Sequence, residues 1–277
     1  MAAHAVGIGG ARFGGAALAV IAGPCAIESE ELVLLVAEKL AALCRARHLP
    51  FVFKSSYKKA NRSSFGSYTG PGLDEGLGAL GRVRRQLGVP VLTDVHEASE
   101  AQAAAQVVDC LQVPAFLSRQ TDLLVACAKT GLPVNVKKGQ FLAPDDMRQV
   151  AEKLERAGAA GILLTERGTT FGHHDLVVDF RGLVVMRETG WPVVYDATHS
   201  LQHPGGGVTG GDRRFAEPLA LAAVAAGVDG LFFETHPDPE RALSDAATQI
   251  PLDQVERLLD QALRVREAVA DRVSAKA

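Results

Sequence analysis

This chain of 277 residues lacks several features that would assign it to a class at once. Its four cysteines contain no CxxC pair, and a chain of this length can build a core without disulfides. No apolar run reaches the roughly 18 residues that a membrane span needs. The first 26 residues have no basic start and are interrupted by Arg12, which argues against a secretion signal. A formal net charge of -3 excludes general attraction to nucleic acid. We therefore expect a cytoplasmic protein without nucleic-acid or membrane partners.

The hydrophobic content of 47% is sufficient for a large core, and no linker divides the chain, so we expect one domain over residues 1–277. Short apolar runs typical of strands occur at 18–22, 51–54, 91–94, 110–113, 134–137, 162–165, 193–196 and 230–234. Longer helical patterns between them occur at 30–47, 72–87, 99–106, 122–130, 144–157, 213–226 and 252–273. This alternation predicts an α/β fold, a (β/α)8 TIM barrel of parallel strands. Residues 1–17 are expected to form an N-terminal hairpin or flexible cap.

Chemically functional residues follow nearly every predicted strand, and the active sites of such barrels lie at the C-terminal ends of the strands. The densest group lies between residues 54 and 64, where lysine, arginine, serine and asparagine occur with no acidic residue. Cations and neutral donors together suit the binding of phosphate and carboxylate. The alternative is an ordinary solvated basic loop.

Seven cations are expected around the mouth of the barrel: Lys54, Lys59, Arg62, Arg119, Lys137, Lys138 and Arg167. They would repel one another without ligands, so we expect ligands that bring several negative charges. Two phosphorylated substrates, or one phosphorylated substrate with a carboxylate, would meet this condition. The place of Lys138 stays open, because on an alternating strand it points opposite to its neighbour and is equally consistent with a surface position.

A second set of residues at the strand ends is suited to metal binding: Cys25, His199, Glu234 and Asp245. A thiolate, an imidazole and carboxylates can hold Zn²⁺, Fe²⁺, Mn²⁺ or Co²⁺, and this mixed set does not select among them. Their spacing matches no short metal motif. Other histidines therefore remain candidate ligands, namely His96, His173, His174, His203 and His236.

Ordered motifs run along the chain: AGPCAIES at 22–29, FKSS at 53–56, KANRSS at 59–64, LTDVHE at 92–97, PAFL at 114–117, RQTD at 119–122, VKKGQF at 136–141, ERGTTFG at 166–172, DATHS at 196–200, ETHP at 234–237 and LSDA at 243–246. In this order they resemble the family of 3-deoxy-D-manno-octulosonate 8-phosphate (KDO 8-phosphate) synthases, over residues 18–252. The resemblance implies a condensation of phosphoenolpyruvate with D-arabinose 5-phosphate and water. The products would be KDO 8-phosphate, used in lipopolysaccharide biosynthesis, and inorganic phosphate.

The resemblance also implies roles for individual residues. Phosphoenolpyruvate would be held by Lys54, Ser56, Lys59, Gln112, the Ala115 backbone, Lys137, Arg167 and His199. The sugar phosphate would be held by Asn61, Arg62, Ser63, Asp94 and, from a neighbouring subunit, Arg119. That last contact implies a homo-oligomer, which in this family is a tetramer. The residues expected to take part in catalysis are Lys54, Lys59, Asn61, Asp94 and His199.

The cysteine at position 25 places the chain with the metal-dependent members of that family, since metal-independent members have asparagine there. The resemblance thus implies a divalent metal ion held by Cys25, His199, Glu234 and Asp245. One alternative is a DAHP synthase, which shares the barrel and phosphoenolpyruvate but uses erythrose 4-phosphate; KANRSS argues against it, because that enzyme carries a Lys-Pro-Arg-Thr type sequence there. The other is a catalytically silent barrel that binds a phosphorylated metabolite. We expect the glycine-rich segment 203–211 to be an active-site loop.

Overall fold

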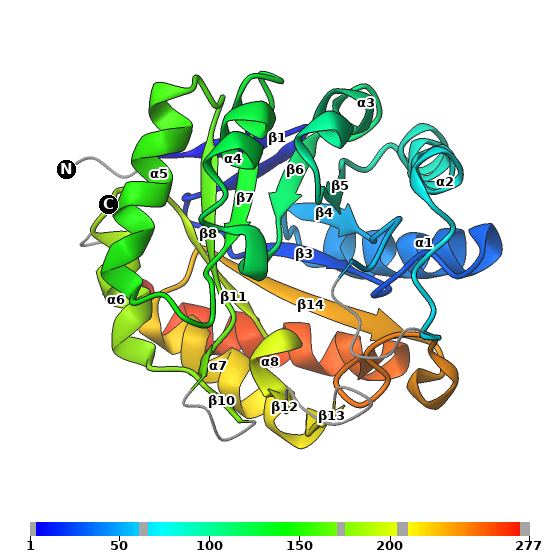
Figure 1. Ribbon diagram of the computed structural model, residues 1–277. Coiled ribbons are helices and arrows are strands. Elements are labelled where there is room, and N and C mark those ends of the chain that lie inside the picture. Colours follow the sequence, from blue (N-terminus) through cyan, green and yellow to red (C-terminus); the bar gives the residue numbers. More distant parts are fainter. Residues whose placement is uncertain (1–3, 61–65, 171–174, 204–209, 272–277) are drawn as a thin grey trace.

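The computed structural model describes residues 4–60, 66–170, 175–203 and 210–271, and its centre is a closed parallel barrel (Figure 1). Each strand pairs with the next, and β14 also pairs with the first barrel strand, β3, which closes the ring. The predicted (β/α)8 barrel is therefore confirmed. Its strands are β3 (Ala19–Gly23), β4 (Phe51–Lys54), β5 (Val91–Asp94), β6 (Cys110–Val113), β7 (Val134–Lys137), β8 (Ile162–Glu166), β11 (Val193–Asp196) and β14 (Gly230–His236).

Helices surround the barrel, and none of those described is long and apolar enough to cross a membrane. They are α1 (Glu30–Ala46), α2 (Leu73–Leu87), α3 (Ala101–Ala105), α4 (Thr121–Ala128), α5 (Met147–Arg156), α6 (Phe180–Arg187), α7 (Ala216–Ala226) and α8 (Val255–Ala268). Helix α8 begins three residues later than predicted, because Leu252–Gln254 forms a 3-10 turn. Shorter strands complete the described part: β1 (Val6–Ile8), β2 (Ala11–Phe13), β9 (Thr169–Thr170), β10 (Leu176–Val177), β12 (Gln202–His203), β13 (Gly210–Gly211) and β15 (Ile250–Pro251).

Helix α6 was not among the predicted helical patterns. Its sequence, FRGLVVMR, contains glycine and two adjacent valines, which weaken a helical signal. The side chain of Asp179 caps the helix by accepting a hydrogen bond from the backbone N–H of Arg181. Leu183 and Met186 are buried on its inner face. Capping and burial thus outweigh weak propensity.

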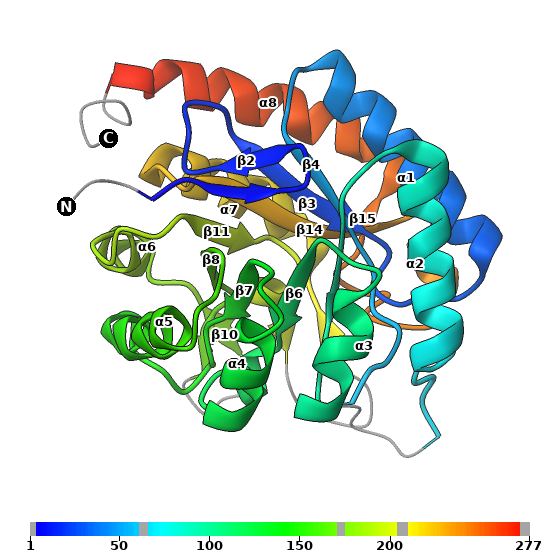
Figure 2. The ribbon, with the colours of Figure 1, turned by 90° about the horizontal axis from the view of Figure 1, so that it is seen from above.

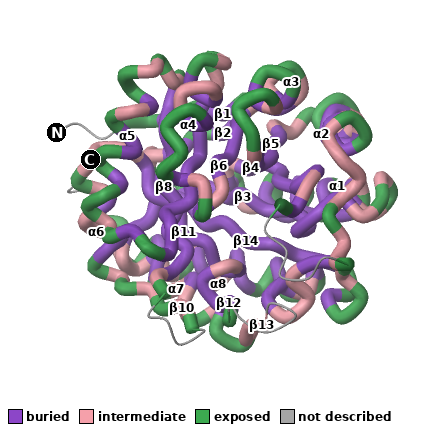
Figure 3. Tube along the Cα trace, in the orientation of Figure 1, coloured by how far each residue is buried: buried purple, intermediate pink, exposed green. Residues whose placement is uncertain are grey.

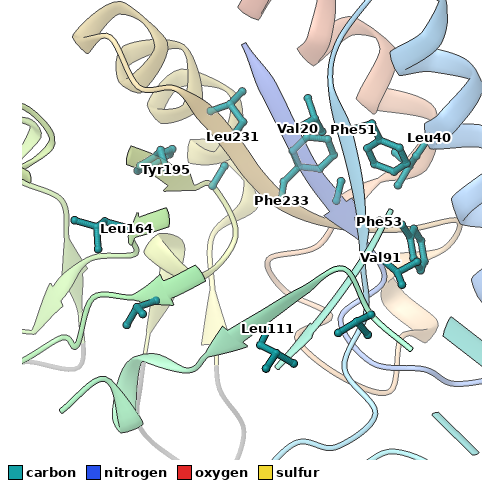
Figure 4. Close-up of a cluster of buried hydrophobic side chains, with 14 of the residues drawn as sticks. Val20, Leu40, Phe51, Phe53, Val91, Leu111, Leu164, Tyr195, Leu231 and Phe233 are labelled. Carbon is teal, nitrogen blue, oxygen red and sulfur yellow. The ribbon is translucent and has the colours of Figure 1, made fainter. Parts of the chain in front are cut away.

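Two hydrophobic cores hold the barrel together. Outward side chains of the strands pack against the helices, as Val20 and Phe51 do near Leu40 of α1 in Figure 4. Inward side chains near the strand starts form a second core with the antiparallel hairpin of β1 and β2 (Figure 2). Phe13 of this hairpin lies beside Gly230, at the first position of β14. Figure 3 shows the result, with buried strands at the centre and the exposed residues concentrated on the outer helices.

The inward positions change character along each strand. On β4 the inward Val52 belongs to the interior core, whereas Lys54, two residues later, is buried and charged. The same change occurs on β5 from Leu92 to Asp94 and on β11 from Val194 to Asp196. The C-terminal half of the barrel interior is therefore lined with buried polar groups, and the site is built there.

Candidate active site

Four of the seven predicted cations converge at the C-terminal end of the barrel. Lys54 and Lys137 are the last residues of β4 and β7, while Lys59 and Arg167 lie in the segments that follow β4 and β8. All four are at most 9% exposed. Arg167 donates from Nη2 to Gln202 at 2.8 Å, but its buried Nη1 has no hydrogen-bond partner in the described part of the chain. An unpaired buried guanidinium nitrogen is a donor available to an anion.

The other three predicted cations have different places. Lys138 is buried away from the mouth, so the surface alternative for it is wrong. Arg119 is exposed and makes no ion pair or hydrogen bond with another of the described residues. Arg62 lies outside the described residues, together with Asn61 and Ser63. Residues 204–209 of the predicted glycine-rich loop, and His173 and His174, lie outside them as well.

Carboxylates lie among the converging cations, so the repulsion expected from the sequence is offset. Lys54 donates to Glu234 at 2.8 Å, and the Lys59 ammonium lies 3.7 Å from the same oxygen. Lys137 donates to Asp196 at 2.6 Å. Burial favours the neutral form of Glu234, but Lys54 and Lys59 overcome it and hold the pKa of that carboxyl well below its usual range. The sequence analysis counted only the cations at the strand ends. It missed the carboxylates on other strands that supply their counter-charges.

The predicted metal ligands meet beside these charges. Donor atoms of Cys25, Glu234 and Asp245 all lie within 4.8 Å of one another. His199 is not part of this three-residue group but lies beside it, with its Nε2 at 3.6 Å from Glu234 and 3.7 Å from Asp245. Asp245 adopts a left-handed backbone conformation with φ 49°, which is uncommon for a residue with a side chain. The segment carrying it approaches Cys25, whose backbone N–H donates to the side chain of Gln249.

The chemistry of this set fits a metal ion. Among the residues that the structure describes, Glu234 Oε2 is buried without a hydrogen-bond partner, although the other oxygen of this carboxylate is paired. Burial raises the pKa of the Cys25 thiol, and the charges of Asp245 and Glu234 raise it further. The thiol accordingly donates to Asp245 at 3.2 Å. A cation at this point would provide the missing partner for Glu234 and favour the thiolate.

Asp196 is a site residue that the sequence analysis left without a role. Its Oδ2 accepts a hydrogen bond from the Lys137 ammonium and lies 2.8 Å from His199 Nδ1. Its Oδ1 accepts a hydrogen bond from the backbone N–H of His199 at 2.9 Å. Burial favours its neutral form, but His199 and Lys137 hold the pKa of Asp196 well below its usual range. Binding Nδ1 leaves Nε2 of the imidazole facing the carboxylates. The sequence signal that could have identified Asp196 as a site residue was its position in the motif DATHS at the end of a predicted strand.

Asp94 anchors a neighbouring part of the site. Ser56 donates to its Oδ1 at 2.5 Å, and His96 Nε2 lies 3.2 Å from Oδ2, so His96 lies beside Asp94 and not in the metal group. Gln112 accepts from Asn135 at 2.9 Å inside the barrel. Ala115 is buried and begins a 3-10 turn shortly after β6.

Fold and site together define a (β/α)8-barrel protein with a buried cationic pocket beside a candidate metal centre. The chain belongs to the DAHP synthetase I family, whose model matches residues 6–271. It is 54% identical over 259 residues to the 2-dehydro-3-deoxyphosphooctonate aldolase of Desulfotalea psychrophila, covering 93% of this chain and 92% of that protein. The protein of the same name from Syntrophobacter fumaroxidans is 56% identical, with 93% and 90% covered.

A third relative of that name, from Acidithiobacillus ferrooxidans, is 58% identical over 242 residues, with 87% of this chain and 86% of the relative covered. The name is a synonym of KDO 8-phosphate synthase, so the resemblance drawn from the motifs is confirmed. The relatives favour this identification over DAHP synthase.

Proposed function

We propose that the protein condenses phosphoenolpyruvate with D-arabinose 5-phosphate and water to give KDO 8-phosphate and inorganic phosphate. The observation that carries this proposal is the convergence of four buried cations on a Cys, His, Glu and Asp set at the mouth of the barrel. The names of the relatives support the product, and the resemblance to KDO 8-phosphate synthases implies the substrate pair.

The buried cations would hold phosphoenolpyruvate. Lys137 and Arg167 flank the mouth from neighbouring strands, and Arg167 has a guanidinium nitrogen free for an oxyanion. Lys54 and Lys59 approach from β4 and its loop. Ser56, Gln112 and the Ala115 backbone would add neutral contacts. Fixed positive groups of this kind lower the cost of gathering anionic reactants and stabilise charge that develops between them.

The sugar phosphate would bind on the Asp94 side of the site. Asp94 is the last residue of β5, its carboxylate is already oriented by Ser56, and the KANRSS segment begins three residues after Ser56. Asn61, Arg62 and Ser63 of that segment would contact the sugar phosphate. Arg119, which is exposed and points to no partner in its own described chain, would reach this phosphate in an adjacent subunit of a homotetramer. We place this enzyme in the cytoplasm.

In the reaction, C3 of phosphoenolpyruvate attacks the aldehyde carbon of the sugar, and water adds at C2. The resulting tetrahedral centre expels phosphate by cleavage of its C–O bond, which leaves the keto group of the product. Lys137 and Arg167 would stabilise the phosphate as it departs, and Asp94 would orient the sugar. A divalent Zn, Fe, Mn or Co ion bound by Cys25, His199, Glu234 and Asp245 would polarise water or the aldehyde.

The charges of the site agree with a bound cation. Its four cations are matched by four carboxylates, namely Asp94, Asp196, Glu234 and Asp245. Without a further positive charge, two phosphorylated substrates would enter a site with little excess of positive charge. A divalent ion restores that excess where the substrates meet.

The test is phosphate release by chelator-treated protein supplied with phosphoenolpyruvate and either arabinose 5-phosphate or erythrose 4-phosphate, with and without divalent metal. We expect release only with the five-carbon sugar and added metal. Release with erythrose 4-phosphate alone would identify a DAHP synthase, and binding without release would identify a silent barrel. Full activity of the metal-free protein would overturn the metal requirement.

A further inference from the structure

Lys138 is a fully buried cation that the proposed reaction does not use. It follows Lys137 at the end of β7 but points to the other side of the sheet, as alternation requires. Its ammonium group donates to the carbonyls of Gly139 and Leu142, at 3.2 and 3.1 Å, and to Thr169 Oγ1 at 3.1 Å. An ammonium has three N–H bonds, so these three acceptors satisfy it. Glu166 supplies the counter-charge, with Oε1 at 3.6 Å.

These contacts join two loops of the active site. Gly139 and Leu142 belong to the loop after β7, which follows Lys137, whereas Thr169 belongs to the loop after β8, which carries Arg167. The backbone N–H of Thr170 also donates to the carbonyl of Gln140 at 3.1 Å. These hydrogen bonds thus connect the segment that follows Lys137 to the segment that carries Arg167.

Glu166 controls the backbone next to Arg167 directly. Its Oε1 accepts from the backbone N–H of Gly168 at 2.6 Å. Gly168 has φ 97°, a conformation that favours glycine, so the chain turns sharply one residue after Arg167. Lys138 neutralises the carboxylate that holds this turn. The pair formed by Lys138 and Glu166 therefore holds the backbone turn that follows Arg167.

We propose that Lys138 is a positioning residue for phosphoenolpyruvate, acting with Glu166 as a buried clamp that aligns Arg167 with Lys137. The inference rests on the proposed function, in which Arg167 and Lys137 bind that substrate. A buried ion pair is seldom the most stable filling for such a space, because apolar side chains of similar size usually do as well. What the pair adds is directional hydrogen bonding to both loops.

The experiment compares the substrates separately. Lys138→Met should raise KM for phosphoenolpyruvate by about 10 to 100-fold, the scale of outer-shell effects on a binding site, and weaken its calorimetric affinity equally. KM for arabinose 5-phosphate should stay within about twofold, because Asp94 lies on β5, which β6 separates from β7, and keeps its own contact with Ser56. Lys39→Met, at an exposed position of α1, is the matched control and should change neither constant.

A second pair of variants separates positioning from stability. Lys138→Met leaves the Glu166 charge buried without its counter-ion and should lower the melting temperature. Adding Glu166→Gln removes that charge, so the double variant should regain most of the melting temperature. Its KM for phosphoenolpyruvate should nevertheless stay high, because the clamp is still missing. Thr169→Val, which removes one hydrogen bond and no charge, should give a smaller rise in the same constant.

If KM for phosphoenolpyruvate returned to the wild-type value together with the melting temperature, Lys138 would be merely structural and the proposal would be overturned. An unchanged KM in Lys138→Met would overturn it as well. A wild-type protein that binds phosphoenolpyruvate but releases no phosphate would refute the proposed function instead, and the ratio of calorimetric affinities would still decide the role of Lys138.

Discussion

Glu234→Gln tests whether buried charge pairing holds the empty site together. The carboxylate is 0% exposed and serves two ammonium groups, those of Lys54 at 2.8 Å and Lys59 at 3.7 Å. Removing one partner of a buried pair typically costs about 3 to 5 kcal/mol, since the remaining charge stays desolvated. Glutamine keeps the shape and one acceptor, so we expect the lower end, about 3 kcal/mol. That corresponds to a fall in melting temperature of roughly 6 to 12 °C.

The assay is thermal unfolding in the presence of a chelator, so that metal loss does not contribute. Glu267→Gln, at an exposed position of α8, is the control and should shift the melting temperature by no more than about 1 °C. The folded-state pKa of Glu234 lies below its ordinary value of 4.5, so its contribution is complete above that pH. The difference between wild type and variant should therefore be constant near neutral pH and shrink as the pH falls below 4.5.

A Glu234→Gln protein that melts like the wild type near neutral pH would refute this reasoning. It would mean that the lysines find other partners or leave the interior. The same variant should also bind divalent metal more weakly when the chelator is removed, because a neutral amide replaces a carboxylate ligand.

Three further predictions follow from the geometry. Cys25→Asn should abolish binding of divalent metal in metal analysis, whereas Cys110→Ala should keep the metal. Retention of metal by the Cys25→Asn protein would exclude the thiol as a ligand. Asp196→Asn should lower kcat/KM for phosphoenolpyruvate about 10 to 100-fold by releasing the Lys137 ammonium, with circular dichroism unchanged. Gly23→Ala would place a Cβ 1.9 Å from the backbone carbonyl oxygen of Lys54 on the adjacent strand, and it should lower the free energy of unfolding in urea by about 2 to 3 kcal/mol. Gly10→Ala, where nothing lies within 4 Å of the added Cβ, should lower that free energy little.

Much of the barrel could be predicted because its elements are local in origin. The runs 51–54, 91–94, 110–113, 134–137 and 193–196 have the bounds of the observed strands, since a buried parallel strand is a continuous apolar run ended by polar residues. Helix α6 escaped prediction because its stability comes from the Asp179 cap and from burial against the sheet. The predicted hairpin region does contain an antiparallel pair, but its packing into the barrel bottom depends on long-range contacts.

The sequence by itself determined the alternation of strand and helix, and hence which end of the barrel would carry the chemistry. It also determined the family, because the order of its motifs is a property of the chain alone. Only the tertiary structure decided the electrostatics. Closure of the barrel brings Glu234 of β14 against Lys54 of β4 and Asp196 of β11 against Lys137 of β7, and it places Lys138 beside Glu166 of β8. Coulomb energies and desolvation depend on distances and burial between residues remote in sequence, so they arise only when the ring is closed.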